Sequence, residues 1–418
     1  MSSGLTVNVA VRLRPSDGQS VKSQVALKGQ YGQFAFDKVL DETVSQDKAF
    51  TELALPHVNG FLQGADATIM LFGAGLTGKT YTLEGGSAAL NKEGLIPRSM
   101  LTICRNLSAV PKHRYSLQVS YCALSAGIDA TMIDLLSPST SPVSLKDTSA
   151  AVALDKLTQY PITNFEDIFE VLKQGRIAKA AAFSISGNPL SIGAAPLGGA
   201  PHRPAKLLAA AAHTMLTVRL SGYAANGEQL STCLNFVELA SQEPKDAFGN
   251  PFDSCLTRSL SLAYASLTSV ISALKGLHLA ASDPVLSNSN GSITNTNSNT
   301  AAAAATNKPH IHWRDSALTR WLREALSFSV QLQFVATVSA APDTAPDTLA
   351  TLSYASRFRA GNRTEGMIVT ASWDLAADGV GVGGGGGGRE PNLSHNSNNS
   401  NNNNINISNI SNINNNNN

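Results

Sequence analysis

The chain has 418 residues, which is enough for two or three average domains or for one large α/β domain with insertions and a tail. Its 31 basic and 30 acidic residues leave a formal net charge of +1, which excludes a chain-wide attraction to nucleic acid or to an acidic membrane and leaves charge recognition to local patches. The four cysteines are far apart and form no CxxC pair, which argues against a zinc site and against a disulfide framework.

The first predicted elements are a strand and a long helix. A strand is expected over residues 5–13, because alternation places three valines on one face: Val7, Val9 and Val11. A helix is expected over residues 45–64, with an apolar face made of Phe50, Leu53, Ala54 and Phe61. Thr43 and Gln46 have the spacing of a capping box at its start, and Gly64 is suited to end it.

Strand and helix signals continue to alternate after this helix. The apolar run ATIMLFG, residues 67–73, is typical of a central strand buried on both faces. One helix is expected from Pro97, at its first position, to Leu107, and another over residues 165–175, ended by Gly175. The other expected elements are strands at 115–124, 214–222 and 232–240 and helices at 261–276 and 316–326. This alternation predicts an α/β domain with a central sheet between helices.

Two stretches of low complexity interrupt the pattern. Residues 287–307 are rich in Ser, Asn and Ala and are expected to form an inserted surface loop, because long loops add little closure entropy. Toward its end the chain turns to polyglycine and then to almost pure Asn, Ser and Ile, a composition that buries too little apolar area to offset the entropy of ordering. The expected organisation is one domain over residues 1–365, with an insertion near 282–308, and a disordered tail over 366–418.

The stretch LFGAGLTGKTYTLEGG, residues 71–86, has the composition of a phosphate-binding loop. It satisfies the pattern GxxxxGK[ST] with Gly73, Gly78, Lys79 and Thr80. In such a loop the glycines let backbone N–H groups converge on phosphate oxygens, the lysine brings a positive charge, and the threonine offers a hydroxyl to Mg²⁺. The alternative is an ordinary glycine-rich turn. A buried strand before the loop and a helix start after it favour phosphate binding.

Several segments, in order along the chain, resemble the kinesin motor domain. They are AVRLRP (10–15), FAFDKVLDETVSQDKAF (34–50), ADATIMLFGAGLTGKTYTLEG (65–85), HIHWRDSALTRWLREAL (310–326) and TLSYASRFRA (351–360). The resemblance covers approximately residues 5–362, and several motifs in one order are more specific than any single motif. It implies a P-loop NTPase fold, an α/β domain with a central mixed β-sheet of about eight strands and helices on both faces, three on each side.

The resemblance also implies the residues of the nucleotide site. Arg12, Arg14 and Pro15 match the family's RxRP element on the adenine side, and Tyr81 takes the aromatic position after the loop. The implied phosphate contacts are Gly73, Ala74, Gly75, Leu76, Thr77, Gly78, Lys79 and Thr80. The implied cofactors are ATP and Mg²⁺, with Thr80 as the metal ligand. Without the resemblance, an arginine and a proline at the end of an edge strand would be interpreted as surface residues.

The two segments that sense the γ-phosphate in kinesins are altered in this chain. Where the family has SSRSH, this sequence has AAAAH, so the alanines at 209–212 supply neither a hydroxyl for Mg²⁺ nor an arginine, and only His213 matches. Where the family has DLAGSE, this sequence has ELASQE, in which Gln242 replaces a serine. Glu238 and Glu243 are the candidate catalytic residues, although Glu243 has lost the arginine with which it would pair.

These changes bear on hydrolysis. Glu238 keeps a carboxylate one methylene further out, whereas Ser241 replaces a glycine whose N–H approaches the γ-phosphate and adds a Cβ there. Removing one preorganised donor typically slows an enzyme about a hundred- to thousandfold, so weak or absent ATP hydrolysis is expected. Arg203 or Lys206, in the extra stretch 187–207, could supply the missing charge; the favoured alternative is a solvated loop.

The resemblance places a tubulin-binding surface over residues 261–326. Its basic residues are Lys275, Lys308, His310, His312, Arg314, Arg320 and Arg323. Docking on acidic tubulin is expected at low salt, although Ala317 has replaced one basic residue of the family's pattern. The two histidines of HIH could be interpreted as a metal pair, but without further ligands nearby a surface strand or loop is favoured. Leu318, Trp321, Leu322 and Leu326 are expected in the core, with Arg314 and Asp315 as the functional pair.

Two functions follow from these patterns, and both bind ATP and microtubules but neither nucleic acid nor membranes. One is a microtubule motor with impaired turnover, and the other is a non-motile adaptor that docks on microtubules. Whole-chain resemblance favours the motor, and the altered segments favour the adaptor. An unrelated P-loop nucleotidase is a third possibility, for which Glu238 is the one candidate metal-binding residue.

Motility and location are predicted from what the sequence lacks. No sustained heptad pattern follows Arg359, so the sequence gives no basis for processive walking. A basic leader is absent at the N-terminus, and no apolar run reaches about 18 residues. A location in the cytoplasm, on the cytoskeleton, is therefore expected.

Overall fold

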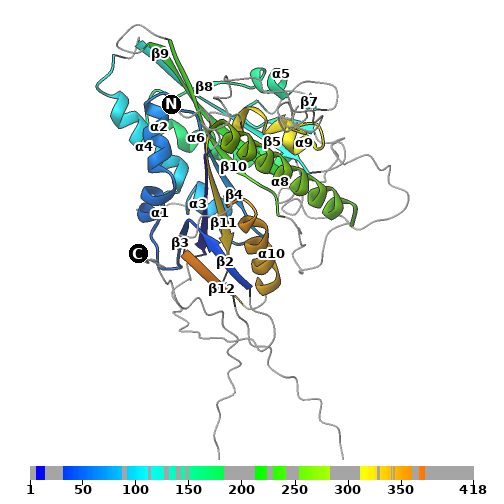
Figure 1. Cartoon of the computed structure of the whole chain (residues 1–418). Helices are drawn as coiled ribbons and strands as arrows, with labels where there is room; N and C mark the ends of the chain where they lie inside the picture. Colours follow the sequence, from blue (N-terminus) through cyan, green and yellow to red (C-terminus); the bar gives the residue numbers. More distant parts are fainter. Residues whose placement is uncertain are drawn as a thin grey trace, which may run out of the picture.

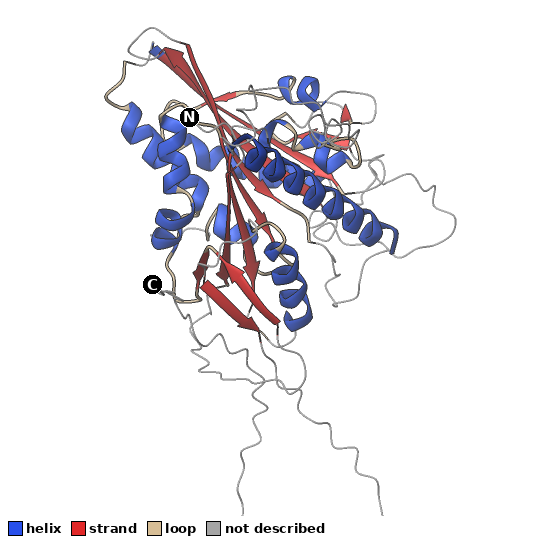
Figure 2. Ribbon diagram, in the orientation of Figure 1, coloured by secondary structure: helices blue, strands red, loops and turns tan. Residues whose placement is uncertain are grey.

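The fold is a mixed central sheet covered by helices on both faces, as Figures 1 and 2 show for the computed structural model. The structure describes residues 6–14, 32–86, 92–111, 114–126, 131–137, 143–145, 150–182, 212–223, 229–241, 254–282, 311–326, 330–339, 341, 344–359 and 367–371. This architecture confirms the α/β class expected from the sequence. No helix within the described residues combines the length and apolar character needed to span a bilayer.

Within the described residues, the main sheet has ten strands. Its order is β3 (Lys38–Leu40), β1 (Thr6–Leu13), β11 (Gln331–Val338), β4 (Ala67–Phe72), β10 (Gln229–Glu238), β9 (Ala212–Tyr223), β5 (Tyr115–Ser125), β6 (Thr131–Asp134) and β7 (Val143–Ser144), while β8 (Tyr160–Pro161) pairs with β5. Neighbouring strands from β3 to β10 pair in parallel, and neighbouring strands from β10 to β7 pair in antiparallel register. The count exceeds the expected eight because β7 and β8, of two residues each, extend the sheet.

A second sheet of two strands lies outside the main one. It pairs β2 (Gly32–Phe36) with β12 (Met367–Ala371) in antiparallel register. Residues 367–371 were expected to begin the disordered tail, and that expectation is wrong for this segment because its backbone pairs with β2. The rest of the tail and the insertion expected near 287–307 lie outside the described residues.

Helices cover the sheet on both faces (Figure 1). Their bounds are α1 (Gln46–Leu53), α2 (Leu55–Leu62), α3 (Lys79–Leu83), α4 (Leu95–Leu107), α5 (Ala150–Asp155), α6 (Asp167–Ala182), α8 (Ser254–Ser282), α9 (Ala317–Trp321), the 3₁₀ helix η3 (Glu324–Leu326) and α10 (Ala345–Ser356). The core between α8, α9, α10 and the sheet includes Val9 and Val11, and the core beneath α1, α2, α4 and α6 includes Ala10. Alternate residues of β1 therefore enter opposite cores, as the spacing of its valines predicts.

The helix expected over residues 45–64 is divided into two. Pro56 lies in the first turn of α2, and a proline inside a continuous helix would lose one hydrogen bond and clash with the preceding turn. The cap of α1 is Ser45, whose Oγ accepts from the Lys48 N–H at 3.2 Å, so the capping box expected at Thr43 is wrong. The Thr43 hydroxyl instead donates to Asp41 Oδ1 at 2.5 Å. Gly64, with φ +97°, follows the end of α2 as expected.

Three other helix boundaries differ from expectation. Helix α4 begins at Leu95 after Gly94, so Pro97 lies inside its first turn rather than at its first position. Helix α8 extends beyond the expected 261–276 at both ends, and the helix expected over 316–326 becomes α9 followed by η3.

Helix α6 was expected to end at Gly175, but it runs on to Ala182. Gly175 serves packing there, because a Cβ at this position would lie 2.2 Å from Cε1 of Tyr121. The glycine therefore lets α6 lie closely on β5 rather than ending the helix.

Candidate nucleotide-binding site

The phosphate loop connects the buried strand β4 to the short helix α3. Gly78 has φ +94° and occupies the position just before α3, a left-handed conformation that glycine adopts without strain. Gly73 lies against β11, where a Cβ would come within 2.3 Å of the Thr337 carbonyl oxygen. Both glycines of the motif are thus required by the backbone path, which supports a cradle and not an ordinary turn.

Lys79 is buried inside the loop. Its ammonium donates to the carbonyl oxygens of Gly73 and Ala74, each at 2.7 Å, and its Nζ lies 3.4 Å from Oγ of Ser241. Burial lowers the pKa of Lys79 to about 8, while the negative charge of Glu238 opposes this shift. A positive charge that folding has moved out of water gains strongly from an anion placed beside it.

Thr80, in the first turn of α3, meets Glu238, the last residue of β10. The Thr80 hydroxyl donates to Oε1 of Glu238 at 2.9 Å. Mg²⁺ prefers oxygen ligands and is commonly held by one or two protein groups together with phosphate oxygens, so this pair fits the metal that the loop implies. No group of three or more His, Cys, Asp or Glu side chains suited to a metal occurs within the described residues, and a Mg²⁺ ion here would depend on the nucleotide for further ligands.

Arg12 is buried beside the loop although the sequence alone favoured a surface position. It lies in β1, which has neighbours on both sides, and its guanidinium carbon is 5.9 Å from the centre of the Tyr81 ring. Its Nη1 donates to Oε1 of Gln46 at 2.9 Å, and Gln46 Nε2 donates to the Tyr81 carbonyl at 2.7 Å. Burial lowers the pKa of Arg12 to about 10, and its Nε and Nη2 have no hydrogen-bond partner among the described residues. Gln46 was considered only as a helix-start residue, and 34 positions separate it from Arg12.

The tip of the loop is strained and exposed. Leu76 has φ +63°, the one positive φ outside glycine in the described part of the chain, and 88% of its surface is exposed. Arg14 Nη1 donates to the Leu76 carbonyl at 3.0 Å and links the end of β1 to this tip. Thr77 lies below it, with its Oγ1 at 2.9 Å from Oγ1 of Thr337. Pro15 lies outside the described residues.

His213 and Ser241 belong to the described parts of the two altered segments, which are residues 212–213 and 238–241. The Ala240 N–H donates to Nδ1 of His213 at 3.1 Å, so the two segments contact each other through this bond. Burial lowers the pKa of His213 to about 3, so the ring is neutral at physiological pH. Ser241 is buried, with its side chain toward Lys79. Gln242, Glu243 and the alanines at 209–211 lie outside the described residues, as do Arg203 and Lys206.

Glu84 is a buried carboxylate that sequence analysis did not identify. Arg176 of α6 lies 3.5 Å from its Oε2, and the Tyr121 hydroxyl donates to its Oε1 at 3.4 Å. Burial raises the pKa of Glu84 to about 7, which the Arg176 charge partly offsets. It follows α3 directly and so ties the helix of the phosphate loop to α6.

The basic cluster expected to face tubulin is partly used by the fold. Lys275 donates to the Phe358 carbonyl, burial lowers its pKa to about 8, and Arg320 Nη1 donates to the Leu145 carbonyl at 2.8 Å. Arg314 and Arg323 are exposed, and Lys308 and His310 lie outside the described residues. Asp315 lies 4.0 Å from Nδ1 of His312. The four apolar residues expected in the core are buried there: Leu318, Trp321, Leu322 and Leu326.

Together, a phosphate loop after a buried parallel strand and a carboxylate at the end of the next strand define a P-loop NTPase fold. The family model for the kinesin motor domain matches residues 4–186 and 209–360. The chain therefore belongs to the kinesin motor domain family.

Curated relatives agree with this assignment. The chain is 24% identical over 333 residues to kinesin-like protein Klp68D of Drosophila pseudoobscura pseudoobscura, with 79% of this chain and 35% of the relative covered. It is 26% identical over 393 residues to KIN-5A of Arabidopsis thaliana, with 85% and 33% covered. The chain thus spans about a third of the length of these relatives.

Solved structures share the fold. A fast kinesin, studied for its ATPase mechanism and interactions with microtubules, superposes with a TM-score of 0.60 at 20% identity, over 86% of this chain and 93% of that one. Drosophila NOD, docked with bovine tubulin into a map of the nucleotide-free NOD–microtubule complex, gives 0.55 at 19% identity, over 85% and 97%.

Proposed function

We propose that this protein binds ATP with Mg²⁺, docks on microtubules and hydrolyses ATP slowly or not at all. The observation that carries the proposal is the combination of a complete phosphate loop with a buried serine, Ser241, at 3.4 Å from the loop lysine. The loop favours binding of the triphosphate, and the serine occupies the position from which the family's glycine approaches the γ-phosphate.

Nucleotide binding is supported by the way in which the loop is built. Gly73 and Gly78 occupy positions that no side chain suits, and Lys79 is held inside by two carbonyl oxygens. An anion arriving at the loop would accept hydrogen bonds from the ammonium in place of those carbonyls, so a neutral acceptor would be exchanged for a charged one. Thr80 and Glu238 lie together where the metal is expected.

Weak turnover is supported by the lost groups. Hydrolysis depends on donors that are in place before charge develops on the transferring phosphoryl group. The alanines at 209–212 supply no hydroxyl and no guanidinium, and each lost donor costs about a hundred- to thousandfold in rate.

Microtubule docking is supported by family membership and by the NOD neighbour, whose structure was docked on microtubules. The surface proposed is that of residues 261–326, where Arg314 and Arg323 are exposed. With two exposed arginines in the described part of this surface, we expect weak binding that falls further with added salt. Because we propose that the protein docks on microtubules, we also propose that it is located on the cytoskeleton.

A non-motile adaptor is the second candidate. It is supported by the chain that follows α10, because β12 pairs with β2 and holds that segment against the domain. A gliding assay separates the two candidates: an adaptor retains microtubules on a coated surface without moving them, and a motor transports them.

The test of the main proposal combines two measurements on the full chain. Co-sedimentation with microtubules is measured with ADP, with a non-hydrolysable ATP analogue and without nucleotide, and phosphate release is measured on the same samples. We expect nucleotide-dependent pelleting and negligible phosphate release. The proposal would be contradicted by a turnover number of several ATP per second. It would also be contradicted if the amount of protein that pellets with microtubules depended on neither nucleotide nor salt concentration.

A further inference from the structure

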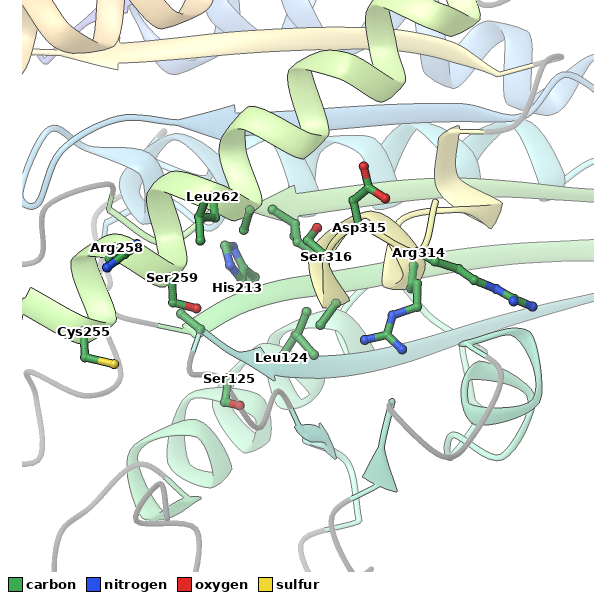
Figure 3. A pocket seen from close by; sticks show the side chains of 15 residues that line it. Leu124, Ser125, His213, Cys255, Arg258, Ser259, Leu262, Arg314, Asp315 and Ser316 are labelled. Carbon is green, nitrogen blue, oxygen red and sulfur yellow. The ribbon is translucent and has the colours of Figure 1, made fainter. Parts of the chain in front are cut away.

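A groove lies between α8, α9 and the end of β5, apart from the phosphate loop, and has a volume of about 520 Å³ (Figure 3). We propose that it binds a small organic anion that has an apolar body. The volume is in the range of small-molecule sites, roughly 300–1,000 Å³. None of its described lining residues belongs to the phosphate loop. Leu262 and Arg314 also lie within the surface proposed to dock on microtubules, so the inference goes beyond the proposed function by adding a small-molecule ligand at that surface.

Apolar side chains form much of the groove. Leu124 comes from the end of β5 and Ala126 follows that strand, while Leu318 comes from α9 and Leu262 from α8. Leu262 is 62% exposed, although a leucine on a helix that packs against a core is usually buried. An apolar ligand body in the groove would remove this surface from water, at about 25 cal/mol for each Å² covered.

Positive charge predominates around this apolar surface. Among the described residues, three arginines line the groove against a single carboxylate, that of Asp315, which lies 4.0 Å from His312. Figure 3 shows Arg258 and Arg314 on opposite sides, with His213 and Leu124 between them. The third, Arg320, is anchored to the Leu145 carbonyl, and its buried Nε has no hydrogen-bond partner among the described residues.

His213 adds a neutral donor to the wall. Its Nδ1 accepts the Ala240 N–H, so in the neutral ring the proton is on Nε2. Burial lowers the pKa of His213 to about 3, and the ring therefore adds no positive charge at physiological pH. Arg258, Arg314 and His213 thus give the groove guanidinium and N–H donors, the kind of donor set that suits a carboxylate, a sulfonate or a phosphate.

The test uses the full chain and the aromatic sulfonate anilinonaphthalene sulfonate as the probe. Cys255 lines the groove and is exposed, so its alkylation by iodoacetamide, followed by mass spectrometry, reports on occupancy. Cys104 on α4 is the internal reference. Protection follows 1 + [L]/Kd, so at about nine times Kd we expect Cys255 to react about tenfold more slowly and Cys104 to be unaffected.

Matched variants test whether the arginines of the groove bind the charged group of the ligand. Arg258→Glu with Arg314→Glu should abolish protection of Cys255, and both side chains are exposed, so folding should be preserved. Arg105→Glu, on the exposed side of α4, should leave protection unchanged. The uncharged analogue phenylnaphthylamine should protect weakly in the unmodified protein, a comparison that needs no variant.

The proposal would be overturned if Cys255 were protected equally in the double variant and the unmodified protein, if the uncharged analogue protected Cys255 as well as the sulfonate does, or if the sulfonate gave no protection at all. Protection by a short polyglutamate peptide but not by the sulfonate would assign the groove to an acidic polypeptide and also overturn it. Lys79→Ala distinguishes this site from the nucleotide site. This variant should bind nucleotide weakly, while the sulfonate should still protect its Cys255 from alkylation.

Discussion

The Ser241 hydroxyl lies 3.4 Å from the ammonium nitrogen of Lys79, so a side chain occupies the side of the phosphate loop that the family leaves to a glycine. Both residues are buried, and they come from segments 162 positions apart. The contact links the loop that holds phosphate to the segment that follows β10.

Replacing Ser241 by glycine should raise the rate of phosphate release about tenfold, because the backbone N–H regains access to the γ-phosphate while the groups missing at 209–212 stay absent. Ser241→Ala is the matched control, since it removes the hydroxyl but keeps the Cβ and should not raise the rate. Phosphate release with and without microtubules measures both. Equal rates in the two variants would show that the Cβ is not what limits turnover.

Lys79→Ala should weaken nucleotide affinity about a hundredfold, because charge-assisted hydrogen bonds worth roughly 3 kcal/mol in total are lost. Equilibrium titration with a fluorescent ADP analogue measures the change. Lys173→Ala, whose side chain is 63% exposed on α6, is the control and should bind normally. If Lys79→Ala bound nucleotide with unchanged affinity, the loop lysine would not be part of the nucleotide-binding site.

Affinity for nucleotide should also fall as pH rises above about 8, where the Lys79 ammonium of the free protein loses its proton. The same shift affects stability. The lysine is protonated more readily in the unfolded chain, so its contribution to the free energy of unfolding rises between about pH 8 and 10.5. Titrations with the ADP analogue across this range, with Lys79→Ala as the reference, test the first effect.

Glu84 should make the protein less stable as pH rises. Its pKa is raised from 4.5 to about 7 in the folded chain, so the folded state binds more protons than the unfolded state between these values. The free energy of unfolding relative to Glu84→Gln should therefore fall across that range, by about 3 kcal/mol at most.

Urea unfolding at a series of pH values measures this difference, with Glu170→Gln on the exposed side of α6 as the surface control. A constant difference between the wild-type chain and Glu84→Gln would show that the buried carboxylate is not responsible.

Gly175→Ala should lower the free energy of unfolding by about 1–3 kcal/mol, because its Cβ would lie 2.2 Å from the Tyr121 ring. Gly276→Ala on α8 is the opposite case, with nothing within 4 Å of the added Cβ, and should raise stability by about 0.5–1 kcal/mol. Urea unfolding of both variants provides the measurement. If the two substitutions changed the free energy of unfolding by the same amount, helix propensity rather than packing against Tyr121 would determine the effect of Gly175→Ala.

Sequence patterns predicted the elements whose signal is local. The continuous apolar run of β4, the alternating valines of β1 and the glycines of the phosphate loop each depend on residues within a few positions of one another. Helix ends were less certain, because Pro56 divides one expected helix while Gly175 interrupts none. The local sequence does not distinguish a glycine that ends a helix from a glycine that allows a neighbouring element to pack closely against the helix.

By itself, then, the sequence determined the α/β class, the family resemblance and the phosphate loop with its lysine and threonine. The tertiary structure alone decided that Arg12 is buried against Gln46, that Glu84 pairs with Arg176 and that His213 faces the groove. The reason is physical: such contacts join residues brought together only when strands and helices pack, and burial then sets the pKa of each group. No spacing along the chain encodes that environment.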